Sequence, residues 1–191
     1  WITDMVLKVF PIPGTLALGA KKHLKAYFVP AAVPAPEEKL RACIRADTRR
    51  ALGVLFLWIA LGVALGSLFK RRILGEKELF LAAVFFYVCD LICVVVWCPF
   101  RDWFLKNRCC TTCRIFNWDH LMMVTPLAGV RSFFCGSLVA AALFVFLLWE
   151  YRVYRYPKRF FEGTNDALKC RNCTDLLCKK KRRDKNPDYP L

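Results

Sequence analysis

The sequence predicts an all-α integral membrane protein: a four-helix transmembrane bundle with an amphipathic N-terminal region and a Cys-rich cytoplasmic tail. The first observation is a conflict in composition, because the 191 residues are 57% hydrophobic and yet carry 30 Lys and Arg against 15 Asp and Glu. The second is that the two classes are segregated, since residues 51–69 and 132–149 hold no charged residue and residues 80–97 hold only Asp90. Runs of about 18 or more apolar residues match the ~20 that a helix needs to cross a bilayer. A soluble globular fold is therefore excluded.

The N-terminal region covers residues 1–50. Its first 20 residues mix apolar side chains with Lys8 and two prolines, a pattern too interrupted to span a membrane. We expect an amphipathic segment that lies at the interface or packs against the rest of the chain. Because the first residue is Trp1 rather than Met, we also expect the true start to lie upstream.

The first long helix is expected to begin well before the first apolar run. Three prolines within residues 28–36 predict an extended connector. Glu37 and Glu38 follow it directly, and acidic side chains are favourable in the positively polarised first turn of a helix. We therefore expect one helix to run from these residues through the basic residues 39–50 into the span at residues 51–69.

A fourth, shorter span is expected at residues 115–130. Its apolar part is interrupted by Pro126 and Gly129, and sixteen residues of α-helix give only about 24 Å against a hydrocarbon core of ~30 Å. Pro126 is tolerable there because neighbouring helices or Thr125 can satisfy the freed backbone group.

The distribution of basic residues favours four spans over three. With both termini inside, 25 of the 30 Lys and Arg lie on the inner side, whereas three spans leave 13 inside and 16 outside. Because cytoplasmic loops carry the excess of basic residues, we predict cytoplasmic termini and a location in the bacterial inner membrane. The expected bundle covers residues 51–156 with a Cys-rich loop at residues 101–118, and the basic Cys-rich tail covers residues 157–191.

Eleven cysteines are unevenly distributed along the chain. Those predicted inside spans, which we expect to pack as small hydrophobic residues, are Cys89, Cys93 and Cys135. Those predicted on the cytoplasmic side or at its boundary are Cys43, Cys98, Cys109, Cys110, Cys113, Cys170, Cys173 and Cys178. A reducing compartment keeps thiols free, so clustered cysteines there indicate metal or redox chemistry rather than a disulfide framework.

Two C-x-x-C pairs predict a metal site. Cys110 with Cys113, and Cys170 with Cys173, each place two thiolates on one turn, and together they complete a tetrahedral set of four. This spacing of cysteine ligands favours zinc as the first choice. An iron–sulfur cluster is the alternative, because surplus thiols are present. The reserve or second-site ligands are Cys109 and Cys178. Because 56 residues separate the two pairs, the membrane hairpin must bring them together.

Two polar positions near the membrane are further candidates. Asp90 lies within a span, where an ionisable group is costly and is a functional candidate by default. The alternative is that Asp90 stays protonated, or forms a hydrogen bond with Tyr87 or with a polar group of a partner subunit. His120 follows Asp119 at the start of the short span. It is either a metal ligand or proton relay oriented by the carboxylate, or part of an interfacial helix start.

The stretch that begins at Cys110 and ends at His120 (CTTCRIFNWDH) resembles the cysteine-rich stretch of the DHHC palmitoyltransferases, which are also four-span proteins with this loop between spans two and three. The second histidine and the nucleophilic cysteine of that family would fall at Leu121 and Met122. The resemblance covers barely a dozen residues, and it implies no acyl-transfer chemistry for this chain because both of these residues are absent.

These features predict a small integral membrane subunit with a cytoplasmic Cys-ligated metal site, acting as an anchor, docking surface or electron-transfer element rather than as a stand-alone enzyme. Two alternatives are a quinone-linked thiol–disulfide oxidoreductase and a thiophilic-metal transporter lined by Cys89, Cys93 and Asp90. The expected partners are the lipid membrane, protein subunits, and anionic lipids that contact the basic residues 179–183. Nucleic-acid binding is not expected, since no aromatic or fold signature accompanies the charge.

Overall fold

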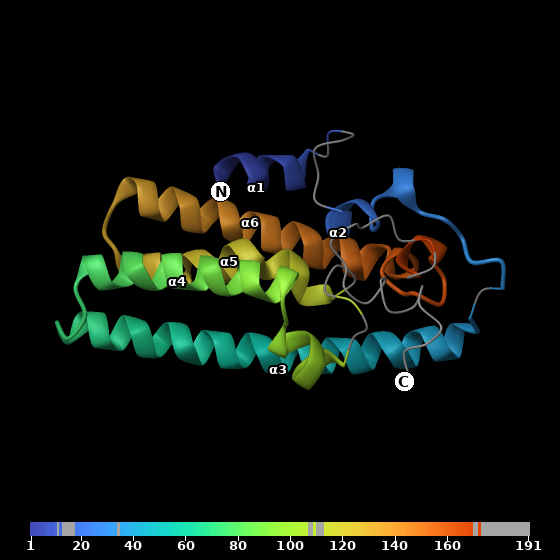
Figure 1. Cartoon of the computed structure of the whole chain (residues 1–191), viewed down its shortest axis with the longest axis horizontal. Helices are drawn as coiled ribbons and strands as arrows, with labels where there is room; N and C mark the ends of the chain where they lie inside the picture. The colour runs from blue at the N-terminus through green and yellow to red at the C-terminus, as the bar shows by residue number, and fades with distance from the viewer. Residues whose placement is uncertain are drawn as a thin grey trace.

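A computed structural model describes residues 1–10, 12, 18–33, 35–106, 109, 113–169 and 172. Over these residues the chain is helical and contains no strand; Pro30 and Asn165 form one isolated bridge. Three helices are long and apolar enough to cross a membrane, namely α3 (Glu37–Lys70), α4 (Glu76–Val95) and α6 (Phe133–Arg155). They lie side by side along the length of the molecule (Figure 1). The predicted all-helical class is confirmed over the described residues, and the three long helices support the predicted membrane protein.

Helix α3 begins directly after Pro36 and includes both the basic stretch and the first apolar run, as the sequence predicts. It ends at Lys70, and the chain then turns through Arg72, whose φ of 59° lies in the left-handed region. Gly75 precedes α4, and its backbone N–H donates a hydrogen bond of 2.8 Å to the carboxylate of Glu78. This hydrogen bond caps the start of α4 close to the end of α3.

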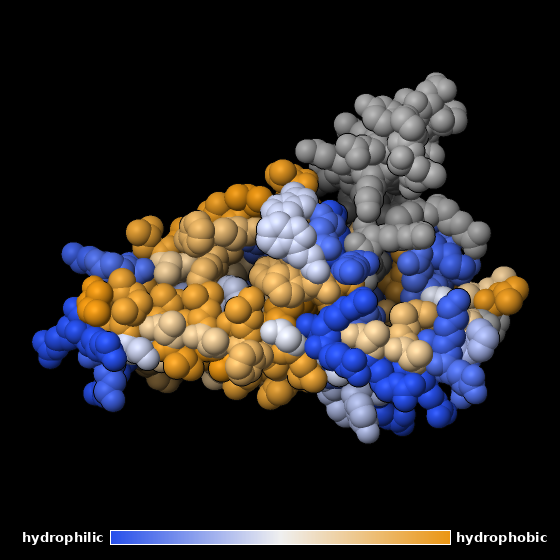
Figure 2. Space-filling view, turned by 90° about the horizontal axis from the view of Figure 1, so that it is seen from below, coloured by the Kyte–Doolittle hydropathy of each residue, from blue (hydrophilic) through white to orange (hydrophobic). Residues whose placement is uncertain are grey.

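The three long helices present apolar side chains to their surroundings. Phe56 of α3, Leu81 of α4 and Phe133 of α6 are 76%, 69% and 93% exposed. Figure 2 shows a hydrophobic band flanked at both ends by hydrophilic residues. Large apolar side chains gathered in one band are costly in water and favourable in lipid, so this surface fits the interior of a bilayer.

The connection between α4 and α6 starts with two short elements that carry the Cys-rich loop. The π-helical turn η2 (Phe100–Leu105) follows Pro99 and ends at Lys106, which has a left-handed φ of 52°. The chain then reaches the 3₁₀ turn η4 (Arg114–Trp118), where Arg114 forms an ion pair with Glu150 of α6 and donates 2.8 Å to the hydroxyl of Thr48 in α3.

The predicted short span is a composite element rather than a single α-helix. After η4 come α5 (Asp119–Val124) and the 3₁₀ turn η5 (Thr125–Gly129), where Gly129 lies beside Phe69 near the end of α3. The segment therefore follows α3 from Thr48 to Phe69, which corresponds to about 32 Å of α-helix. The 3₁₀ rise of ~2.0 Å per residue makes this reach possible, because it exceeds the 1.5 Å of an α-helix.

The N-terminal helices pack on the outside of these elements. Helix α1 (Ile2–Val9) lies along α6 (Figure 1), with Met5 buried and Arg152 donating to the carbonyl oxygens of Lys8 and Val9. The expected packed N-terminal segment is thus observed. Two short turns follow, α2 (Leu18–Lys21) and the 3₁₀ turn η1 (Lys25–Tyr27).

The end of the described chain folds back onto the N-terminal connector. Beyond α6 lie the 3₁₀ turns η6 (Pro157–Arg159) and η7 (Asp166–Leu168). Asn165 is fully buried, and its amide donates to the carbonyl oxygens of Lys22 at 3.1 Å and Arg159 at 2.8 Å. Because both donors of this buried amide are satisfied, Asn165 holds the region after α6 against Lys22, which lies 143 residues earlier in the chain.

Candidate functional site

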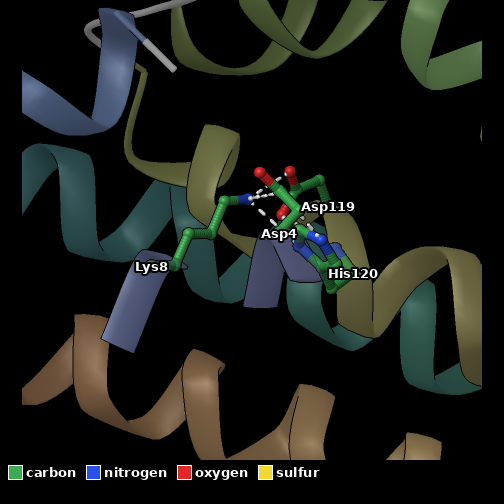
Figure 3. A network of polar contacts seen from close by, with 4 residues as sticks. All are labelled: Asp4, Lys8, Asp119 and His120. Carbon is green, nitrogen blue, oxygen red and sulfur yellow. Dashed lines mark hydrogen bonds and ion pairs between the residues drawn. The ribbon is translucent and has the colours of Figure 1, made fainter. Parts of the chain in front are cut away.

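A cluster of four ionisable side chains joins α1 to α5 (Figure 3). The Lys8 ammonium donates to Asp119 Oδ2 at 2.5 Å and lies 3.0 Å from His120 Nδ1. The other ring nitrogen, His120 Nε2, lies 3.0 Å from Asp4 Oδ2. Asp119 Oδ1 accepts from the backbone N–H of His120 and lies 2.8 Å from Nδ1. One imidazole therefore contacts two carboxylates and one ammonium group.

Burial makes the charges of this cluster depend on one another. Lys8 is only 2% exposed and His120 4%, so the ammonium group is held away from water and depends for its counter-charge on Asp119 and, at 3.6 Å, on Asp4. The hydrogen bond from His120 lowers the pKa of Asp4, the most exposed member of the set. The ring can take up a proton at Nδ1 facing Asp119, or leave Nδ1 free to accept from Lys8, so the cluster can hold a proton in two arrangements.

The same cluster offers three oxygen and nitrogen ligands for a metal ion. Ligand atoms of Asp4, Asp119 and His120 lie within 4.8 Å of one another. Lys8, however, already supplies the cationic charge between them, at 2.5 Å from Asp119. A divalent ion there would face a buried ammonium group, so the donor set fits a charge-balanced anchor better than a metal centre.

A second feature is an apolar cavity of about 290 Å³ beside this cluster. Its walls are mostly aromatic and aliphatic side chains from α3, α4 and the segment between α4 and α6. The thiol and carboxyl groups that line it belong to Cys89, Asp90, Cys93, Cys98, Cys113 and Asp119. Cys93 and Cys98 share a hydrogen bond, and the backbone N–H of Arg101 donates to Cys98 Sγ at 3.4 Å. A pair of adjacent thiols therefore faces a largely apolar space.

The predicted membrane acid, Asp90, lies on the wall of this cavity. It also lies within electrostatic range of Lys8, Asp119 and His120, so α1 brings a basic residue near it. Sequence reasoning missed this, because Lys8 belongs to a segment that was expected only to be amphipathic. The available signal was the i, i+4 spacing of Asp4 and Lys8, two opposite charges in a short and mostly apolar helix.

The predicted cysteine ligands are described only in part. Cys113 is buried at the cavity wall and Cys109 is half-buried. The other predicted ligands lie outside the described residues; they are Cys110, Cys170, Cys173 and Cys178. Cys135 lies in the buried core as expected for a small hydrophobic side chain, whereas Cys89 and Cys93 face the cavity.

A third feature is a pocket of about 260 Å³ between the Cys-rich loop and the region after α6. Lys106 and Arg114, which flank the loop cysteines, line it together with Leu168. After Leu168, the backbone N–H of Asn172 donates 3.1 Å to the carbonyl oxygen of Lys169. Residues on both sides of the Cys110 and Cys113 pair therefore line the same pocket as Leu168, which lies shortly before the Cys170 and Cys173 pair in the sequence.

The described part of the chain is helical, with three helices able to cross a membrane, a buried ionic anchor and a thiol-lined cavity. No protein-family model, no curated protein and no solved structure matches this chain.

Proposed function

We propose that this chain is a small integral membrane subunit that crosses the bilayer four times and carries a Cys-ligated metal ion on its cytoplasmic face. Zinc is the first choice and an iron–sulfur cluster the alternative. The role is that of an anchor or docking surface for partner subunits, with electron transfer added if the site holds a cluster. The termini lie in the cytoplasm, and the inner membrane of a bacterium is the proposed location.

The path of the segment between α4 and α6 supports the fourth crossing. Arg114 lies level with Thr48 and Glu150 near one end of the apolar band, and Gly129 lies level with Phe69 near the other. A length near 30 Å matches the hydrocarbon core of a bilayer. Four crossings also keep 25 of the 30 basic residues on one side.

One observation carries the metal proposal. Lys106, Arg114 and Leu168 line the same pocket, although the segments they belong to are separated by α6 in the chain. The distance in sequence between the two C-x-x-C pairs is the main objection to a shared site, and the meeting of residues that flank both pairs at one pocket supports the proposal against it. Nearby basic side chains favour deprotonated thiols, which are the form that binds a metal.

Metal analysis of the full chain, purified without oxygen, tests the proposal. We expect about one zinc per chain, or a brown protein with iron and sulfide for a cluster. Cys113→Ser and Cys173→Ser should each lower the metal-to-protein ratio. Cys135→Ser should leave the ratio unchanged, because the thiol of Cys135 in α6 is buried in the hydrophobic core. A wild-type chain that binds neither zinc nor iron overturns the proposal.

A second candidate function is favoured by the apolar cavity. Its volume of about 290 Å³ exceeds the needs of a bare metal ion, and its aromatic walls suit a planar quinone ring next to the thiols of Cys93 and Cys98. Oxidation would form one S–S bond between them and pass two electrons and two protons to a quinone, giving the quinol.

A short-chain quinone added to the reduced chain tests this second function. We expect stoichiometric quinol and a mass loss of two hydrogens located on the peptides of Cys93 and Cys98. Cys98→Ser should abolish both signals and Cys135→Ser should retain them. Quinol formation that survives Cys98→Ser would rule this pair out.

A further inference from the structure

A basic pocket of about 330 Å³ lies where the C-terminal end of α6 meets the turns after α2. Four cationic side chains line it, and they come from two distant parts of the chain: Lys21, Lys25, Arg152 and Arg159. Its base is partly aromatic, since the ring of His23 stacks on Phe160 with 4.5 Å between the centroids. The fold thus gathers at least four positive charges around one hollow.

These charges are not balanced by acidic groups of the described chain. The residues that line the pocket include no Asp or Glu, and none of the ion pairs among the described residues involves Lys21, Lys25, Arg152 or Arg159. Arg152 and Arg159 also repel each other electrostatically. Like charges held together in this way favour an anion between them.

The position of the pocket specifies the kind of anion. Arg152 follows the apolar part of α6 and lies over the ring of Trp149 at 4.9 Å, and Tyr27 and Tyr156 line the pocket. Trp149 is buried in the core, but Tyr27 and Tyr156 are 38% and 40% exposed, and tyrosine side chains gather at the headgroup level of membranes. Because this level is rich in lipid phosphates, the pocket opens where an anionic headgroup is available at high local concentration.

We propose that this pocket binds the phosphate group of an anionic phospholipid. Guanidinium groups hold phosphate oxygens through paired, charge-assisted hydrogen bonds, and the two lysines add point charges at the rim. A bound headgroup would neutralise the repulsion between Arg152 and Arg159. It would also hold the N-terminal turns against the end of α6. The residues that line the pocket are neither proposed metal ligands nor part of the basic run at residues 179–183.

Native mass spectrometry of the purified full chain in neutral detergent tests the proposal. Phosphatidylglycerol is compared with phosphatidylcholine, and we expect the anionic lipid to bind at least about fivefold more tightly. Arg159→Gln should weaken phosphatidylglycerol binding about fivefold. This variant is preferred to a change at Arg152, because Arg152 also donates to α1.

Arg155→Gln is the matched control. Arg155 and Arg159 both lie over the ring of Tyr156, at 5.4 and 4.2 Å, but only Arg159 lines the pocket. The control should bind as the wild type does, and the exposed Lys25→Gln should show a loss like that of Arg159→Gln. Equal binding of the two lipids, or an equal loss in Arg155→Gln, would overturn the proposal. Displacement of the lipid by millimolar glycerol phosphate would contradict the lipid assignment and identify a soluble phosphate site instead.

Discussion

The ammonium group of Lys8 lies 2.5 Å from a carboxylate oxygen of Asp119, which joins α1 to a residue 111 positions later in the chain. Both side chains are largely removed from solvent, at 3% and 13% exposure. An ion pair of this kind holds one geometry, because either partner left alone would be a buried, uncompensated charge. The relationship makes α1 an integral part of the helix assembly.

Removal of the lysine should release α1. Lys8→Met leaves Asp119 without its counter-charge, and we expect a loss of about 3–5 kcal/mol in stability. Thermal unfolding in detergent and protease cleavage within the first residues of the chain measure this. Lys77→Met, at the exposed start of α4, is the matched control. If the double variant Lys8→Met with Asp119→Asn is as unstable as Lys8→Met alone, charge pairing is not the cause.

Acid should loosen α1 only at low pH. The hydrogen bond from His120 holds the pKa of Asp4 below the ordinary 3.8, so its stabilising contribution is complete above that value. The contribution is lost as the pH falls through the lower pKa of the folded state. Hydrogen exchange of residues 2–9 between pH 7 and 3 should show opening only below about pH 4. Asp4→Asn should reduce this dependence, and opening already near pH 6 would assign it to another group.

The two glycines of the G-x-x-x-G spacing in α3 should differ sharply. A Cβ at Gly62 would lie 3.0 Å from the methyl group of Thr125, whereas a Cβ at Gly66 meets nothing within 4 Å. Thr125 cannot move freely, because its hydroxyl accepts from Trp58 and donates to the carbonyl oxygen of Leu121. We expect Gly62→Val to lower stability by about 1–3 kcal/mol and Gly66→Val to have little effect. Equal melting temperatures would mean that η5 does not pack against α3 at this point.

Labelling of single cysteines tests the four-crossing topology. In a chain whose own thiols are replaced, Arg131→Cys and Arg71→Cys should react with an impermeant reagent added to intact cells. Glu162→Cys and Glu38→Cys should react only after lysis, because the proposed topology places both positions on the basic, cytoplasmic side. All four parent side chains are exposed, so access does not depend on burial. Protection of position 131 together with labelling of position 71 would leave only three crossings.

The fold class could be predicted because its evidence is local. A helix that crosses a membrane must be apolar over consecutive residues. Three such apolar runs are visible in the sequence, at residues 51–69, 80–97 and 132–149. The helix start at Glu37 was readable for the same reason, since Pro36 and two acidic residues act within one turn. Pro126 and Gly129 likewise predicted an interrupted short segment.

The candidate site could be predicted only in part. Asp90, His120 and Cys113 were identified as residues that are unusual for their surroundings, and the structure places Asp90 and Cys113 on one cavity wall, with His120 in the neighbouring cluster. Their partners Asp4 and Lys8 were not identified. Their i, i+4 spacing places opposite charges on one face of α1, but it does not show that this face packs beside α5.

The sequence by itself determined the apolar lengths, the basic ends and the cysteine spacing of this protein, because each depends on residues close together in the chain. The tertiary structure alone decided that Lys8 meets Asp119, that Cys93 meets Cys98 on a cavity wall, and that Arg152 and Arg159 share a pocket with Lys21. Most of these contacts join segments far apart in the chain. Such contacts depend on the packing of whole elements, and hydropathy and spacing carry no information about which distant elements will pack together.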